Sequence, residues 1–240
     1  MSNALIQKIN FMKSKHRSNL LLRQWSQDGY WCRQNDLLKV KDPKVFKDTI
    51  ERIHVDDITV DDFIEKYERG HRPCIITGVT DGWPGMTDWQ MNRLVERFGE
   101  CLFKIGESDS GRKLKVTLKE YLEYALFNRD DSPLYLFESS IEDHPQAKVM
   151  LDEYEVPKFF RKDLFVDLLG EKKAPPHRWF LIGPRRSGSE VHQDPLGTSA
   201  WNTSVCGHKR WVLFPPTEGI TKDLVMGKHL ARQGEDDEAI

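Results

Sequence analysis

The sequence lacks any long run of apolar residues. No stretch approaches the roughly 18–20 residues that a membrane-spanning helix needs, and Lys8, Lys13 and Lys15 interrupt the apolar residues near the start of the chain. This start also lacks the compact apolar stretch and the small-residue cleavage site of a secretory signal peptide. We therefore expect an intracellular protein with no membrane partner.

Cysteine is scarce, and internal repeats and low-complexity segments are absent. No two of the four cysteines form a C-x-x-C pair, since they stand far apart at Cys32, Cys74, Cys101 and Cys206. They could form two disulfides in an oxidising compartment, whereas in a reducing compartment we expect free, buried thiols.

Neither sign of charge dominates the chain. Lys and Arg number 36 and Asp and Glu number 38, for a net charge of −2, which argues against a wholly basic nucleic-acid-binding domain. Residues 4–25 predict a helix that carries a basic cluster from Lys13 to Arg17. This cluster fits either a nuclear-import or RNA-contacting patch or a solvated helix face, and we favour the solvated face.

The composition is that of a globular protein. Hydrophobic residues make up 38% and charged residues 31% of the 240 residues, with seven Trp and twelve Phe. These proportions predict a substantial core. The length suits one large domain, or a domain with a helical extension.

The sequence predicts three more helix starts after the helix over residues 4–25. Thr59 with Asp62, and Thr117 with Glu120, have the spacing of a capping box, in which a hydroxyl and a carboxylate satisfy free amide groups. The first pair matches less well, because Asp is shorter than the usual Glu or Gln. The third helix is predicted over residues 89–98, with Thr87 or Asp88 as its cap.

Short runs rich in β-branched and aromatic residues lie between these helices and dominate after about residue 174. They predict strands over residues 74–77, 102–105, 113–116, 134–137, 178–182, 198–205 and 210–214. This order indicates an α+β protein whose C-terminal half is a cupin-like double-stranded β-helix, or jelly roll. The predicted parts are a helical extension (1–57), a mixed α/β part (58–173) and the first portion of the barrel (174–240).

The barrel is expected to be incomplete. A jelly roll has about eight strands, and only a few fit after residue 178. The last residues, 234–240, pass from a charged loop to an apolar pair, as if another strand were beginning.

The strongest chemical motif is His192-Gln193-Asp194. Two residues that stand two apart on a strand point to the same face, so the imidazole of His192 and the carboxylate of Asp194 could bind one metal ion. This pair is two-thirds of the facial triad of non-haem Fe(II) oxygenases. By itself the pattern is weak, because a lone H-x-D is more often a hydrogen-bonded surface pair.

Lys209 opens the predicted strand over 210–214, whose remainder is apolar. A buried Lys is costly unless it is paired, and a dicarboxylic keto acid could supply the partner. The spacing fits equally well a Lys that points into water.

The run from His192 to Trp211 closely resembles JmjC-domain oxygenases. It includes Gly207-His208-Lys209-Arg210-Trp211, and matching segments extend upstream to residues 130–135 and 67–69. It is most similar to the phosphatidylserine-receptor-like subgroup, described as arginine demethylase and lysyl hydroxylase. The resemblance covers roughly residues 25–240.

The resemblance implies a role for each matching residue. His192 and Asp194 would be catalytic iron ligands, and Lys209 would bind the distal carboxylate of 2-oxoglutarate. Tyr135, Asn202 and Ser189 would help to hold this cosubstrate, with Ser189 at a position where the family often has Thr.

The family's third iron ligand is a later His, and only His208 and His229 follow Asp194. Neither fits that role well, so we expect the chain as given to lack the third ligand and to have little or no activity.

The implied activity is Fe(II)- and 2-oxoglutarate-dependent oxidation of a protein by O2. The resemblance favours lysyl hydroxylation of Arg/Ser-rich splicing regulators ahead of arginine demethylation of histones, with RNA contact and a nuclear location. The alternative is a catalytically inactive cupin-like module that binds protein or RNA.

Overall fold

A computed structural model of the chain describes residues 1–32 and 48–216. The chain divides into two compact units. Among the described residues, unit 1 consists of 1–32, Gly82–Glu155 and Asp163–Gly188, and unit 2 of 48–81, Val156–Lys162 and 189–216. The three-part division expected from the sequence stays a prediction.

Unit 1 begins with a shorter helix than the sequence predicts. Helix α1 spans Asn3–His16, and after a turn the 3-10 helix η1 spans Leu22–Trp25. The basic cluster is not wholly solvated, because Lys13 is buried whereas Lys15 is exposed.

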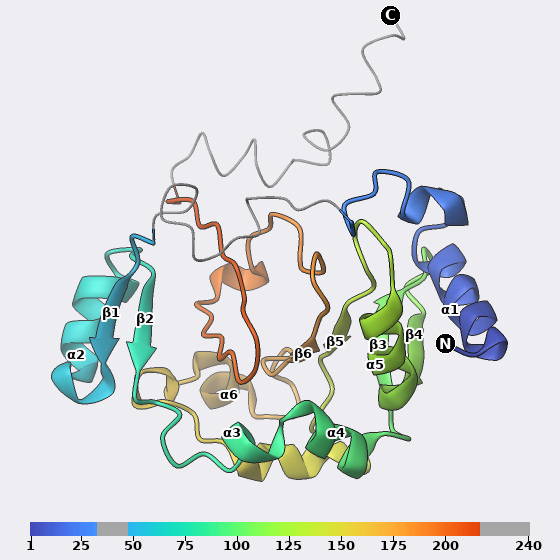
Figure 1. Ribbon diagram of the computed structural model, residues 1–240. Helices are drawn as coiled ribbons and strands as arrows, with labels where there is room; N and C mark the ends of the chain where they lie inside the picture. The colour runs from blue at the N-terminus through green and yellow to red at the C-terminus, as the bar shows by residue number, and fades with distance from the viewer. Residues whose placement is uncertain (33–47, 217–240) are drawn as a thin grey trace, which may run out of the picture. The chain divides into compact units, whose positions relative to one another are not determined.

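The core of unit 1 forms around a β-hairpin. Strand β3 (Leu102–Glu107) pairs antiparallel with β4 (Lys113–Thr117), and the register shifts between Lys104 and Gly106. Alternate residues of both strands are fully buried, including Phe103 and Val116. Helices α1 and α5 (Leu118–Phe127) contact this hairpin (Figure 1).

The capping box predicted before α5 is confirmed. The Thr117 hydroxyl oxygen accepts from the Glu120 amide at 3.3 Å, and the Glu120 carboxylate accepts from the Thr117 amide at 2.9 Å. Two orphan amides at the helix start are thereby satisfied.

The third predicted helix exists, but its cap was predicted wrongly. Helix α4 spans Met91–Phe98 and follows Gln90 without a side-chain cap. Thr87 and Asp88 instead lie in a separate one-turn helix, α3 (Gly85–Asp88). Pro84 immediately precedes α3, and proline favours the first turn of a helix.

Three further elements complete unit 1. They are the 3-10 helix η5 (Ala147–Glu153), the helix α6 (Leu164–Leu169) and strand β6 (Phe180–Ile182). Glu153, at the end of η5, accepts from the Trp89 indole at 2.6 Å and pairs with Arg97 of α4. This carboxylate therefore ties η5 to α4.

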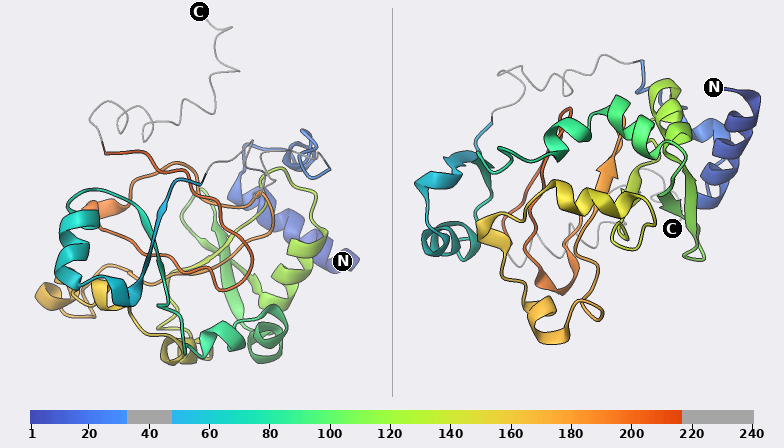
Figure 2. Two further views of the ribbon diagram at one scale, coloured as in Figure 1. Left: turned by 60° about the vertical axis from the view of Figure 1, so that its left-hand side comes forward. Right: turned by 90° about the horizontal axis from the view of Figure 1, so that it is seen from below.

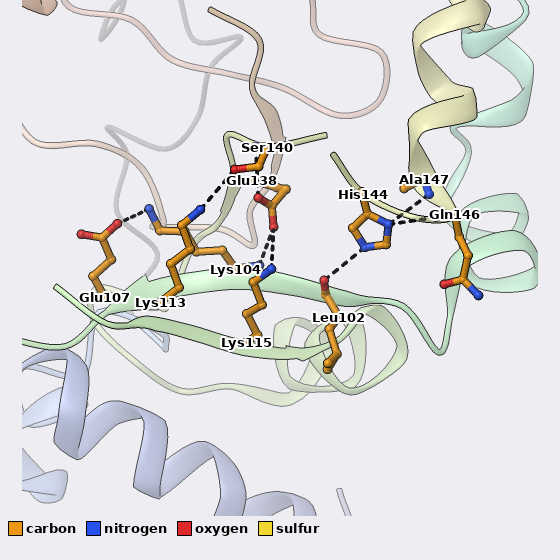
Figure 3. A network of polar contacts seen from close by, with 10 residues as sticks. All are labelled: Leu102, Lys104, Glu107, Lys113, Lys115, Glu138, Ser140, His144, Gln146 and Ala147. Atoms are coloured by element: carbon orange, nitrogen blue, oxygen red, sulfur yellow. Dashed lines mark hydrogen bonds and ion pairs between the residues drawn. The ribbon is translucent and has the colours of Figure 1, made fainter. Parts of the chain in front are cut away.

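Strand β5 (Leu136–Glu138) pairs antiparallel with β6 and contacts β3. The buried carboxylate of Glu138 accepts from the amides of Lys104 at 3.1 Å and Ser140 at 3.2 Å, and lies 4.0 Å from the Lys115 ammonium (Figure 3). A side chain thus satisfies a backbone donor of β3 at the edge that faces β5.

Unit 2 contains a parallel pair of strands, β1 (Glu51–His54) and β2 (Cys74–Thr77), together with helix α2 (Val60–Phe63) (Figure 2). The turn η3 (Val55–Asp57) precedes α2, and the π-helix η4 (Ile64–Glu68) follows it. The 3-10 turns η6 (Lys158–Phe160) and η7 (Pro195–Gly197) also belong to this unit. Its apolar cluster contains Phe63, Tyr67 and Phe159.

Thr59 caps α2 as predicted, by accepting from the Asp62 amide at 3.1 Å. Asp62 does not complete the reciprocal box, because its carboxylate accepts the Thr59 hydroxyl at 2.6 Å instead of the Thr59 amide. The short Asp side chain therefore satisfies one fewer backbone donor than Glu120 does at α5.

The predicted strands over 198–205 and 210–214 are wrong, because residues 198–216 have no strand partner in the described part of the chain. The described residues form three two-stranded sheets and no closed barrel. The α+β mixture is confirmed, whereas residues 234–240 lie outside the described ranges.

All four cysteines are free, as predicted. Their expected burial is wrong for Cys32 and Cys206, which are exposed. In the described ranges, no helix combines the length and the hydropathy needed to cross a membrane.

Candidate functional site

The His192–Asp194 segment belongs to unit 2 and is not the strand that the sequence predicts. The backbone turns through η7, where Leu196 and Gly197 have φ values of 64° and 66°. The side chains nevertheless converge, with 3.4 Å between His192 Nε2 and Asp194 Oδ1. The juxtaposition that was expected from strand periodicity is therefore present, although residues 192–194 belong to no strand.

The second ring nitrogen of His192 shows how the imidazole is oriented. Its Nδ1 atom lies 2.6 Å from the backbone carbonyl oxygen of Glu190. A carbonyl oxygen only accepts, so Nδ1 carries the hydrogen and Nε2 of the neutral ring presents its lone pair. Two acceptors, Nε2 and a carboxylate oxygen, then face each other, and a cation between them would satisfy both.

This donor set fits Fe(II). One imidazole nitrogen and one carboxylate oxygen are two members of the facial set that non-haem iron uses. Metal-bound histidines commonly donate the other ring N–H to a backbone carbonyl, as His192 does to Glu190. The sequence could not reveal the contact between the Glu190 carbonyl and His192 Nδ1, because this contact depends on the conformation of the backbone.

A third ligand is not identified in residues 1–32 and 48–216. Within these ranges, no group of three or more His, Cys, Asp or Glu side chains could hold a metal ion. His208 is exposed, and His229 lies outside the described residues. The nature of the third ligand stays a prediction.

Three of the four predicted cosubstrate residues, Ser189, Asn202 and Lys209, are in unit 2, and all three are exposed. The Lys209 ammonium lies 4.9 Å from the centre of the Trp211 ring. Partial desolvation lowers the pKa of Lys209. Within the described part of the chain, no ion pair joins Lys209 to a carboxylate.

Tyr135 belongs to unit 1 and directly precedes β5. It is half-buried, and burial raises the pKa of its hydroxyl. Its ring lies against the backbone of Gly183, where an added Cβ would approach the Tyr135 ring atom Cε2 to 2.7 Å. Glycine at 183 therefore leaves the room that this ring needs.

Unit 1 also contains a cavity of about 380 Å³ beside Glu138 and His144. Both polar side chains already have partners. His144 Nδ1 accepts from the Ala147 amide at 3.1 Å, and its Nε2 lies 3.3 Å from the Leu102 carbonyl oxygen (Figure 3). Glu138 and His144 are therefore already satisfied by groups of the protein itself.

Residues 60–224 match the family model described as a cupin-like domain. The chain belongs to the cupin-like domain family. This match supports the cupin-like part of the predicted fold.

Three relatives of this cupin-like chain carry names of JmjC enzymes. The bifunctional arginine demethylase and lysyl-hydroxylase psr-1 of Caenorhabditis elegans is 46% identical over 190 residues, covering 77% of this chain and 47% of that protein. The lysine-specific demethylase JMJ21 of Arabidopsis thaliana is 39% identical over 160 residues, covering 67% of this chain and 16% of that protein. The 2-oxoglutarate and iron-dependent oxygenase JMJD4 of Gallus gallus is 26% identical over 189 residues, covering 70% of this chain and 44% of that protein.

These matches confirm the resemblance to JmjC oxygenases, including the subgroup named for arginine demethylation and lysyl hydroxylation. The cupin-like chain spans about half the length of the psr-1 relatives.

Proposed function

We propose that this chain carries the iron- and 2-oxoglutarate-binding part of a protein oxygenase. The observation that carries the proposal is His192, whose Nδ1 is held by a carbonyl while Nε2 faces the Asp194 carboxylate at 3.4 Å. Bound Fe(II) would supply the oxidising chemistry, in which O2 and 2-oxoglutarate convert a substrate C–H to C–OH and yield succinate and CO2.

The chain's own residues would hold the cosubstrate. Lys209 offers a positive charge to the distal carboxylate, and a charge-assisted hydrogen bond to a carboxylate is stronger than a neutral one. The hydroxyl of Ser189 and the amide of Asn202 would add neutral hydrogen bonds. Tyr135 is half-buried in unit 1, and its part in holding the cosubstrate comes from the family resemblance.

We propose a protein as the substrate, because psr-1 is named for modification of arginine and lysine. Lysyl hydroxylation of Arg/Ser-rich splicing regulators is the leading reaction, ahead of arginine demethylation of histones. Both reactions begin by hydroxylation of a C–H bond, since an N-methyl group that is hydroxylated then releases formaldehyde. RNA contact and a nuclear location remain part of this proposal.

The test begins with metal binding by the chain itself. Mn(II) can be titrated into the protein in place of Fe(II), and its binding followed by electron paramagnetic resonance. We expect His192→Ala and Asp194→Ala each to weaken Mn(II) binding at least about tenfold, as loss of one metal ligand should. His208→Ala removes an exposed histidine from the same unit and serves as the matched control.

A second measurement connects metal binding to turnover. In a longer protein that carries this segment together with a third iron ligand, succinate formation from 2-oxoglutarate should require Fe(II) and disappear in His192→Ala. If the chain bound Mn(II) equally well with and without His192, the metal assignment would be wrong. If it bound metal but never 2-oxoglutarate, the inactive binding module would become the better account.

A further inference from the structure

The loop between α5 and β5 of unit 1 forms no helix or strand, but it is tied to the segment around η1. The Asp131 amide donates to the Trp25 carbonyl oxygen at 2.7 Å. The Asp131 carboxylate accepts from the amides of Asp28 at 2.8 Å and Tyr30 at 2.7 Å. These contacts fix the backbone immediately before Ser132.

Ser132 presents an exposed hydroxyl in this loop. It is the only Ser or Thr of the 240 residues that is followed by proline, here Pro133. A residue before proline is biased towards extended backbone, which is the conformation in which protein kinases bind their substrates. A Ser-Pro dipeptide is what proline-directed kinases modify. The sequence and the exposure together make Ser132 a candidate for phosphorylation.

The guanidinium of Arg17 lies beside the Ser132 hydroxyl. Its Nη2 atom donates to the Ser132 Oγ atom at 3.1 Å, and its central carbon lies 5.0 Å from the centre of the Trp25 ring. Arg17 follows the last residue of α1, and its amide donates to the Lys13 carbonyl oxygen at 3.1 Å. In residues 1–32 and 48–216, no ion pair joins Arg17 to a carboxylate. A positioned positive charge therefore contacts a neutral hydroxyl.

The other charges at this loop also favour an added anion. Arg186 reaches the loop, where its Nε atom donates to the Asp130 carbonyl oxygen at 3.0 Å. The Asp130 carboxylate is already neutralised by Lys13 at 2.6 Å. The Asp131 carboxylate would repel a phosphate, but it is engaged by two backbone amides. Two guanidinium groups thus stand against one acidic side chain.

We propose that Ser132 is a phosphorylation site and that Arg17 binds the phosphate. A kinase would transfer the γ-phosphoryl group of ATP to Oγ, so that an O–P bond forms, the bond to ADP breaks and the hydroxyl proton leaves. The phosphate adds about −1.5 to −2 charge and three acceptor oxygens. The neutral hydrogen bond to Arg17 becomes a charge-assisted one, which is stronger. Modification of Ser132 would therefore tie the C-terminal end of α1 more firmly to the loop before β5.

The first experiment tests the site itself. The full chain is incubated with ATP and a proline-directed kinase of the cyclin-dependent class, and phosphopeptides are mapped by mass spectrometry. We expect phosphate on Ser132 and none at this loop in Ser132→Ala. A synthetic peptide that spans Ser132 and Pro133 shows that the kinase accepts the sequence. Modification of the peptide without modification of the folded chain would overturn the proposal.

The second experiment tests the role of Arg17. Amide hydrogen exchange, followed by NMR, reports on the Arg17 amide and on the Leu20 amide, which donates to the Arg17 carbonyl oxygen at 3.1 Å. We expect phosphorylation of Ser132 to slow exchange at both amides about five- to tenfold, because a hydrogen bond to a charged group is stronger than a neutral one. Phosphorylation should have little effect in Arg17→Gln, whereas Arg17→Lys keeps the charge and should keep part of the effect.

Two outcomes of the exchange experiment would overturn the proposal. Equal slowing in the unmodified sequence and in Arg17→Gln would show that Arg17 does not bind the phosphate. Faster exchange after phosphorylation would show that repulsion from Asp131 outweighs the attraction to Arg17.

Discussion

The side-chain ammonium of Lys13 lies 2.6 Å from the Asp130 carboxylate, and both residues are buried. The Lys13 ammonium also lies 5.2 Å from the centre of the Trp25 ring. Such a pair compensates for two desolvated charges, but it leaves a costly charge behind when one partner is removed. The pair joins α1 to the loop that leads to Tyr135.

We expect Lys13→Met to lower the free energy of unfolding by about 3–5 kcal/mol, because the buried Asp130 charge loses its partner. Urea denaturation measures this change. Lys15→Met, at an exposed position of the same helix, should change the free energy by less than about 0.5 kcal/mol. Equal losses in the two variants would contradict a special role for the pair.

The capping box of α5 gives a second stability prediction. Thr117→Ala removes the oxygen that accepts from the Glu120 amide, and should lower the free energy of unfolding by about 1 kcal/mol. Thr87→Ala is the matched control, because Thr87 is exposed and caps neither α3 nor α4. Thermal unfolding of both variants should show a clear difference, and a similar loss in Thr87→Ala would count against the cap.

Glu138 gives a third prediction. Glu138→Leu leaves the Lys104 and Ser140 amides without their acceptor, and should cost about 2 kcal/mol or more. Glu138→Gln retains one acceptor oxygen and should recover part of this loss. Denaturant titration of the two variants tests whether Glu138→Gln has the higher free energy of unfolding. Equal stability of Leu and Gln variants would show that the carboxylate is not what holds β5 to β3.

Lys209 gives a prediction about the cosubstrate. Lys209→Ala should raise the dissociation constant of 2-oxoglutarate by about ten- to a hundredfold, since a charge-assisted hydrogen bond contributes about 1.5–3 kcal/mol. Isothermal titration calorimetry with Mn(II) bound measures this constant. Lys172→Ala, at an exposed position of unit 1, is the control. An unchanged constant in Lys209→Ala would exclude Lys209 as the carboxylate partner.

The charge of Lys209 should also make the binding of 2-oxoglutarate depend on pH. Desolvation lowers the pKa of Lys209, so its positive charge is present at neutral pH and is lost as the pH rises through that lowered value. We therefore expect 2-oxoglutarate binding to weaken at a lower alkaline pH than titration of an ordinary lysine would produce. Binding measured across the alkaline range tests this, and Lys209→Arg should remove the dependence because Arg stays charged.

Local features were predictable from the sequence. The cap at Thr117 and the alternation of buried residues in β3 and β4 depend on residues a few positions apart. The approach of His192 and Asp194 is similarly local, because the two residues stand two apart in a segment that belongs to no strand. Residues 198–205 show why local preference is insufficient, because a strand also needs a neighbour with which to pair.

The sequence by itself determined the family resemblance, the caps at Thr59 and Thr117, and the H-x-D spacing of His192 and Asp194, because each depends on a short run of residues. Only the tertiary structure decided that Lys13 is buried, since its partner Asp130 is 117 positions away. It likewise decided that the Tyr124 and Tyr121 hydroxyls accept from the Leu134 and Leu136 amides, and that Glu138 accepts from a backbone amide of β3. Such pairings depend on which segments the folded core brings together, and no local pattern specifies that choice.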